Sequence, residues 1–154
     1  MPFNLDLLTT FGFYTAILAA IYLYLSIHVI LIRAHKKIII GDNNDSLLKR
    51  AIRAHSNFSE YVPIAIIMIF VVSQLTVPMA ISKVKPMSGL THLLFLLLIL
   101  ARVCHAYGML VQEAMRKPKL YMRQVGMFLT FSVIGLAGLV LILNWIYSLA
   151  LQFN

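Results

Sequence analysis

Four long apolar stretches, separated by short polar segments, dominate the pattern of residues along the chain. Each stretch is long enough, or nearly so, to cross a hydrocarbon layer of about 30 Å as a helix. The pattern predicts helices over approximately residues 7–32, 46–77, 90–112 and 120–149. We therefore expect an all-α fold in which residues 1–154 form a single domain, a bundle of four transmembrane helices.

The composition supports an integral membrane protein. Hydrophobic residues make up 61% of the 154 positions and charged residues only 12%, and the mean hydropathy is +0.89. A water-soluble domain of this size could not bury so many apolar side chains. The first apolar stretch has no Lys or Arg before it and is longer than the apolar core of a signal peptide, so we expect it to remain in the mature protein.

The basic residues predict how the helices are oriented. They flank the first connection at Arg33, Lys36, Lys37, Lys49, Arg50 and Arg53, and the third at Arg116, Lys117, Lys119 and Arg123. The second connection holds only Lys83 and Lys85. Because short cytoplasmic loops retain positive charge, both termini should be extracytoplasmic. The net charge of +8 fits contact with anionic lipid, and no basic run interleaved with aromatic residues indicates a nucleic-acid partner.

Polar residues stand where the second helix enters the membrane. Arg53, Asn57 and Glu60 are four and three residues apart, so they share one helix face over about 10 Å. Arg102 would lie about 18 Å into the third helix, where an unpaired guanidinium is expensive. A contact between Arg102 and Glu60 is geometrically reasonable, and it would be a structural ion pair.

The alternative is a polar pocket that opens to the cytoplasm. Its lining would be Arg33, Arg53, Asn57, Glu60, Arg102 and His105. Arginine pairs with carboxylates, a carboxylate binds an ammonium group, and asparagine both donates to and accepts from an amide. Glutathione displays all of these groups together with a thiol. A hydrophobic electrophile dissolved in the bilayer could reach that thiol from the lipid.

Two segments resemble motifs of a known family. They are Arg53-Ala54-His55-Ser56-Asn57-Phe58-Ser59-Glu60-Tyr61-Val62-Pro63 in the second helix and Ala101-Arg102-Val103-Cys104-His105 in the third. With four helices, about 150 residues and a basic first connection, the chain resembles the MAPEG family, the membrane-associated proteins in eicosanoid and glutathione metabolism. The likeness is to its bacterial members in particular and covers nearly the whole chain.

The resemblance implies a homotrimer in a bacterial inner membrane that binds glutathione between adjacent subunits. Positions that match glutathione-binding residues of the family are Arg33, Arg53, Asn57, Glu60, Tyr61 and Arg102. The arginine that stabilises the thiolate belongs near the start of the fourth helix, where Arg123 is slightly favoured over Arg116. The implied function is a glutathione S-transferase, a glutathione-dependent peroxidase or both, acting on hydrophobic electrophiles in detoxification.

One departure from the family pattern favours a different function. Many family enzymes have a tyrosine seven residues after the arginine that matches Arg102, and this chain has Met109 there. Tyr107 lies roughly 200° around the helix from that position and cannot simply replace it. His105, three residues after Arg102, could supply a hydrogen bond instead. The alternative function is a non-catalytic membrane scaffold or lipid-binding protein on the same fold.

Two further classes are weaker alternatives. A b-type haem protein needs paired histidines at one depth, which among His28, His55, His92 and His105 only His55 and His105 could provide. A multidrug exporter would be expected to carry an acidic residue within the first helix. The lone Cys104 cannot form an internal disulfide, and no Cys/His spacing matches a zinc site, so no metal is expected.

Overall fold

The structure, a computed structural model, describes residues 5–75, 86–115 and 120–153. It contains four long helices, α1 (Leu5–Lys36), α2 (Ser46–Gln74), α3 (Pro86–Leu110) and α4 (Tyr121–Gln152). A short 3₁₀ helix, η1 (Gln112–Ala114), follows α3. All four long helices are apolar and long enough to cross a membrane, and they confirm the predicted all-α fold of four helices.

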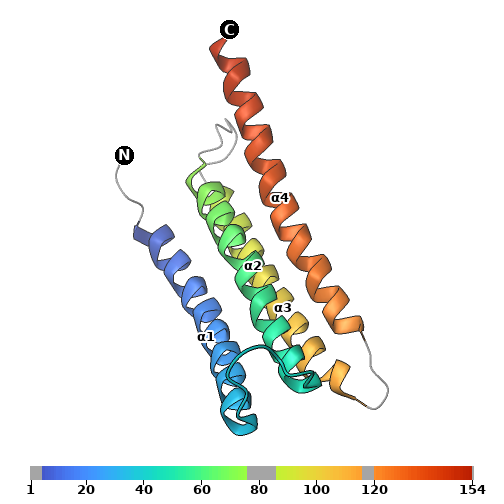
Figure 1. The fold of residues 1–154 in the computed structure, drawn as a ribbon. Coiled ribbons are helices and arrows are strands. Elements are labelled where there is room, and N and C mark those ends of the chain that lie inside the picture. The colour runs from blue at the N-terminus through green and yellow to red at the C-terminus, as the bar shows by residue number, and fades with distance from the viewer. Residues whose placement is uncertain (1–4, 76–85, 116–119, 154) are drawn as a thin grey trace.

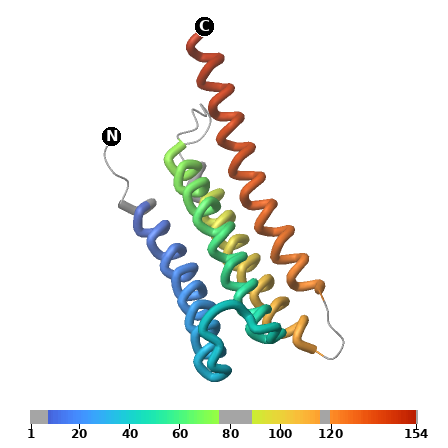
Figure 2. Tube along the Cα trace, in the orientation of Figure 1, coloured from blue at the N-terminus to red at the C-terminus, as the bar shows by residue number. Residues whose placement is uncertain are grey.

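The four helices lie side by side, with the start of α1 and the end of α4 at the same end of the bundle (Figure 1). The first connection and η1 lie at the opposite end. We call that opposite end the inner end, because the basic residues predict that it faces the cytoplasm, and we call the other the outer end. The Cα trace shows α2 and α3 in the middle, with α1 and α4 on either side (Figure 2).

The helix boundaries depart from the predicted ones by a few residues. α1 continues to Lys36 instead of ending near residue 32, and α4 continues to Gln152. The last turn of α1 carries Arg33, His35 and Lys36, and the cations of Arg33 and Lys36 interact favourably with the carbonyl end of a helix. α2 begins at Ser46 as predicted, because Asp45 caps it by accepting a hydrogen bond of 2.8 Å from the Leu48 amide.

The core runs along the seams between neighbouring helices. Leu18 and Leu25 of α1, Phe58 and Ile69 of α2, and Phe95 of α3 belong to one buried apolar cluster. Large apolar side chains on the outward faces, such as those of Phe128 and Trp145, are exposed on the single chain. That distribution is typical of helices that face lipid, because hydrocarbon chains are as apolar as the side chains that they contact.

Glycines bring α3 and α4 together at the inner end. A Cβ atom added to Gly126 of α4 would lie 2.6 Å from the carbonyl oxygen of Ala101, and one added to Gly108 of α3 would collide with the backbone of Arg123. Gly138 approaches the Met68 side chain of α2. Gly135 has no neighbour within 4 Å, so only some of the small residues on α4 serve close packing.

Candidate functional site

The guanidinium of Arg102 lies at the centre of the polar cluster in the inner half of the bundle. Arg102 is eight residues before the end of α3, about 12 Å along the axis, and its exposed fraction is only 1%. Its Nη1 donates to the Asn57 side-chain oxygen on α2 at 2.9 Å and approaches the Asn57 carbonyl at 3.4 Å. Its Nη2 lies 3.9 Å from the Met127 sulfur on α4. Three helices therefore hold this cation.

The ion pair between Arg102 and Glu60, one of the two alternatives that the sequence left open, is not formed. Among the residues that the structure describes, the ion pairs are Lys36 with Asp45 and Arg123 with Glu113. Glu60 is exposed on the flank of α2, and Asn57 occupies the position beside the guanidinium. The neutral amide of Asn57 accepts from Nη1 without the cost of removing a second charge from water.

The Nε atom of Arg102 is buried and has no hydrogen-bond partner within the described ranges. An unsatisfied donor on a buried guanidinium costs free energy, so it marks a place where an acceptor would be stabilised. Carboxylates are the acceptors that arginine binds best, since they can take two parallel N–H donors. The buried cation is therefore only partly used by the protein itself.

The polar face of α2 forms as predicted, but most of it points away from the bundle. Arg53 and Glu60 are exposed, and Asn57 between them is half-buried. Tyr61 is half-buried and packs edge-on against Phe131 of α4, with ring centroids 5.5 Å apart. The face thus leads from the buried Arg102 to the exposed flank of one chain, where a ligand or another subunit could lie.

Arg33 is engaged elsewhere. Its Nη1 donates to the carbonyl oxygens of Ile39 at 3.4 Å and Gly41 at 2.9 Å. These contacts join Arg33 to the first connection, and none of its described contacts is with Arg102 or Asn57. The sequence could not indicate this, because every residue has a backbone carbonyl and residue type does not show which carbonyl will accept a hydrogen bond.

His105 lies one helical turn beyond Arg102 in the seam between α3 and α4. Its exposed fraction is 3%, and its backbone packs directly against Gly126. The position places the ring close to Arg102 on the same helix face, as the spacing of three residues predicts. Met109 is buried in the main apolar cluster, and Tyr107 is exposed on another side, so the two do not share an environment.

Arg123 is the third residue of α4 and is exposed. Its Nη1 donates to the Glu113 carboxylate at 3.0 Å, and Gln112 of η1 accepts from the Met122 amide at 3.1 Å. Sequence reasoning missed Glu113 and Gln112, although two polar residues directly after an apolar helix were a usable signal. Arg116, the other candidate for the thiolate-stabilising arginine, lies outside the described residues.

The histidines face different neighbours. The Nε2 atom of His55 lies 2.9 Å from the Ser26 hydroxyl of α1, and its ring contacts that of Tyr22. His105 instead faces α4. The pair that a haem would need is therefore not formed. In the part of the chain that the structure describes, no group of three or more His, Cys, Asp or Glu residues could hold a metal ion.

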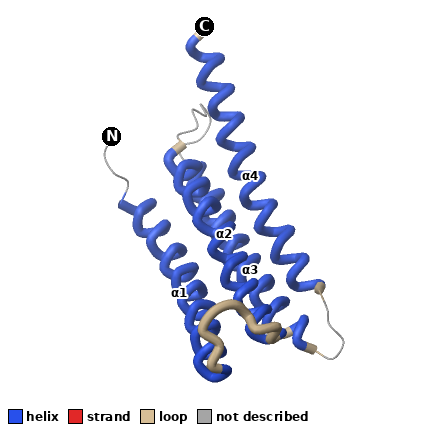
Figure 3. Tube along the Cα trace, viewed as in Figure 1, coloured by secondary structure: helices blue, strands red, loops and turns tan. Residues whose placement is uncertain are grey.

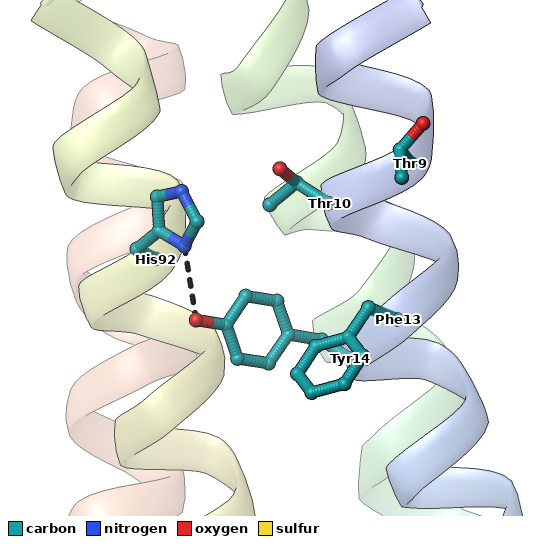
Figure 4. Close-up of a pocket in the computed structure, with 5 residues that line it drawn as sticks. All are labelled: Thr9, Thr10, Phe13, Tyr14 and His92. Atoms are coloured by element: carbon teal, nitrogen blue, oxygen red, sulfur yellow. Dashed lines mark hydrogen bonds between the residues drawn. The ribbon is translucent and has the colours of Figure 1, made fainter.

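A separate cavity of about 540 Å³ lies at the outer end, between α1 and α3. Its lining is Thr9, Thr10, Phe13, Tyr14 and His92, and the Tyr14 hydroxyl points at the ring of His92 (Figure 4). The distance from that hydroxyl to the His92 Nδ1 atom is 2.9 Å. His92 is ten residues before Arg102, about 15 Å along α3, so this cavity contains none of the predicted site residues.

These features define a four-helix integral membrane protein with a buried, partly unsatisfied arginine in the inner half of its bundle. The sequence model of the MAPEG family matches residues 11–143, which is most of the chain. The protein therefore belongs to the MAPEG family. That family includes glutathione transferases and peroxidases as well as other members. No curated protein sequence matches the chain.

Proposed function

We propose that the protein is a membrane-bound glutathione-dependent enzyme, a glutathione S-transferase or peroxidase or both, acting on hydrophobic electrophiles. The observation that carries the proposal is Arg102, a cation buried at membrane depth with one donor left unsatisfied. A cation in that position is expensive unless its donors are paired, and an anion would pair with the donor that is left. Family membership supports glutathione, which supplies two carboxylates, as that anion.

The neighbouring groups suit the rest of the glutathione molecule. Asn57 accepts from Arg102 through its side-chain oxygen, and its NH₂ group can donate to a peptide carbonyl of the ligand. The exposed Glu60 can bind the ammonium group, and the exposed Arg53 can bind the second carboxylate. Tyr61 and His105 would complete the site as hydrogen-bonding groups.

Two exposed charges on the flank of a membrane-embedded helix also support an assembly. Arg53 and Glu60 would be costly against hydrocarbon, whereas a neighbouring subunit could cover the ligand bound to them. A homotrimer with glutathione at each subunit interface meets this requirement. Since the basic residues predict a cytoplasmic inner end, the site would draw glutathione from the cytoplasm and electrophiles from the lipid.

Catalysis requires a thiolate at neutral pH, which a nearby cation favours. Arg123 is our first candidate for that cation and Arg116 the second. In the structure Arg123 pairs with Glu113 at an exposed position, and exposed pairs contribute little, about 0–1 kcal/mol. The guanidinium could therefore turn from Glu113 to a bound thiolate at small cost.

The test is glutathione binding to the detergent-solubilised protein, followed as a rise in melting temperature and by calorimetry. Replacing Arg53 or Glu60 by Ala should weaken binding by about 1.5–3 kcal/mol, roughly ten- to a hundredfold, because a charge-assisted hydrogen bond is lost. Lys49→Ala is the matched control, since Lys49 is an exposed cation one turn earlier on α2. Equal effects at Lys49 and Arg53 would contradict a specific site.

A non-catalytic scaffold or lipid-binding protein is the second candidate. Met109, 5% exposed within the apolar cluster, favours it because no hydroxyl is available at the position where many family enzymes have a tyrosine. Wild-type protein that binds glutathione but shows neither thiolate absorbance nor turnover of a chlorodinitrobenzene would support this second function over the first.

A further inference from the structure

The connection between α1 and α2, residues 37–45, is a folded segment, and we call it the isoleucine loop (Figure 3). Its first half is fixed to α1. The Ile38 amide donates to the Arg33 carbonyl at 3.0 Å, and Ile38 packs into a small cluster with Ile32 and Leu48. Arg33 in turn donates to two loop carbonyls, at Ile39 and Gly41.

The second half of the loop is fixed to α2. Gly41 adopts a φ of +71°, which a residue without a Cβ atom adopts at no steric cost. The Asp42 side chain accepts from the Asn44 amide at 3.0 Å. Asp45 caps α2 and also forms an ion pair with Lys36, the last residue of α1. The loop therefore has one defined shape.

That shape holds two bulky apolar side chains outward. Ile39 is 90% exposed and Ile40 is 87% exposed, the former carrying a carbonyl that Arg33 binds. An unstructured loop could hide such residues, but this one is fixed at both ends and presents them. Two adjacent isoleucines held in water are unfavourable, so an apolar environment is expected around them.

The charges around the pair indicate which apolar environment that is. Lys36 and Lys37 precede the isoleucines, and Lys49 and Arg50 follow in the first turns of α2. Of the two acids in the loop, Asp45 is paired with Lys36 and Asp42 accepts from the backbone. Apolar side chains surrounded by basic ones are the pattern of segments that lie in the head-group region of anionic membranes.

We propose that the isoleucine loop inserts Ile39 and Ile40 into the boundary between head groups and acyl chains of the cytoplasmic leaflet, and that the flanking lysines bind anionic lipid. The position agrees, because the loop follows α1 directly where that membrane-spanning helix ends at Lys36. The loop would thus anchor the inner end of α1 and α2 at a fixed depth.

The test uses the intact protein with one tryptophan moved. Trp145 is the only tryptophan, so Trp145→Phe gives a protein without tryptophan fluorescence. In that protein Ile40→Trp, or separately Ile39→Trp, places a single tryptophan in the loop. The proteins are reconstituted into phosphatidylcholine alone or mixed equally with phosphatidylglycerol. Lipids brominated near the head group or near the chain ends then measure the depth. The natural protein, with Trp145 exposed on α4, serves as the positive control for quenching.

We expect blue-shifted emission and strong quenching by the shallow bromines, greater in the vesicles that contain phosphatidylglycerol. Emission typical of water with free quenching by acrylamide would overturn the proposal. Shielding from both acrylamide and brominated lipid would also overturn it, because a second copy of the chain would then cover the loop.

Lys37→Gln, in the same background, tests the role of charge. Lys37 has a φ of 55°, and Gln there meets the same backbone constraint, so the comparison isolates the cation. The extra quenching due to phosphatidylglycerol should fall severalfold. If quenching is the same in both kinds of vesicle, with Lys37 and with Lys37→Gln, the anionic-lipid part of the proposal fails.

Discussion

At the outer end of the bundle, α1 and α3 are joined by a hydrogen bond between the Tyr14 hydroxyl and the Nδ1 atom of the His92 ring. At the inner end, α2 and α3 are joined through the guanidinium of Arg102 and the amide of Asn57. Both contacts connect neighbouring helices over a similar distance. Only the inner one contains a guanidinium, and among the described residues the Nε donor of that guanidinium has no partner.

Neighbouring helices of this bundle are connected with a guanidinium at one end and without one at the other. At the outer end a hydrogen bond and stacked rings, such as Tyr14 on Phe95, connect α1 and α3 without a guanidinium. A buried cation adds a desolvation cost that a neutral pair avoids. We propose that a bound ligand, and not stability, accounts for the charge at Arg102, and the following variants test that proposal.

The largest effect should be on reactivity. Arg123→Ala should slow conjugation to a model electrophile by about 10²–10³-fold, or about 2.7–4 kcal/mol. The reason is that the thiolate of bound glutathione loses the cation that stabilises it. Thiolate absorbance of bound glutathione should disappear while affinity changes little. Glu113→Gln, which removes only the partner of Arg123, is the control and should keep the thiolate. If the loss follows Arg116→Ala instead, the role moves to Arg116.

Arg102→Met should separate binding from stability. It removes the cation but keeps an unbranched side chain, so glutathione affinity should fall by about 1.5–3 kcal/mol. The melting temperature without ligand should hold or rise, because a partly unsatisfied buried charge is removed.

Tyr14→Phe is the outer-end counterpart of that variant. It should lower stability by about 1 kcal/mol and leave glutathione affinity unchanged. Calorimetry and thermal melts on both proteins test the contrast. A collapse of the fold in Arg102→Met with normal behaviour elsewhere would make Arg102 a structural residue.

Gly126, in the seam between α3 and α4 at the inner end, should tolerate substitution less well than Gly135 of α4. Gly126→Ala should destabilise by about 1–3 kcal/mol, because the added Cβ meets the Ala101 carbonyl and His105. Gly135→Ala has open space and should be neutral or stabilising by up to about 1 kcal/mol, since alanine favours helix. Thermal melts in one detergent compare the two, and equal losses would contradict the seam.

The smallest effect should come from Asp45. The ion pair with Lys36 and the hydrogen bond to the Leu48 amide hold the pKa of Asp45 below its usual 3.8. A carboxylate with a depressed pKa stabilises the folded state above its unfolded pKa and loses that contribution as pH falls below it. Asp45→Asn should therefore lower the melting temperature slightly at pH 7 and make no difference in strong acid. A difference in melting temperature between the two proteins that grows as the pH falls would refute this assignment.

The helices and the start of α2 at Ser46 were predictable because they depend on local chemistry. Apolar runs of membrane length and an acid directly before Ser46 act through neighbours in the sequence. The polar face of Arg53, Asn57 and Glu60 followed from helical periodicity alone.

The partners of the charged residues were not predictable in the same way. Arg102 takes Asn57 and not Glu60 because the relative rotation of α2 and α3 turns Glu60 to the flank. Arg33 binds loop carbonyls whose positions depend on the fold of the first connection. Arg123 and Glu113 meet across a helix break, where sequence spacing sets no distance.

The pairing of Arg102 with Asn57 also bears on the order in which the chain enters the membrane. An arginine in the middle of an apolar helix costs about 2.5–3.5 kcal/mol during insertion, which the remaining apolar residues of α3 must outweigh. Asn57 is synthesised 45 residues earlier than Arg102, so its amide can already be in the bilayer when Arg102 arrives. The α2 helix would then act as a template for α3, and a chain with α2 deleted should leave α3 incompletely inserted.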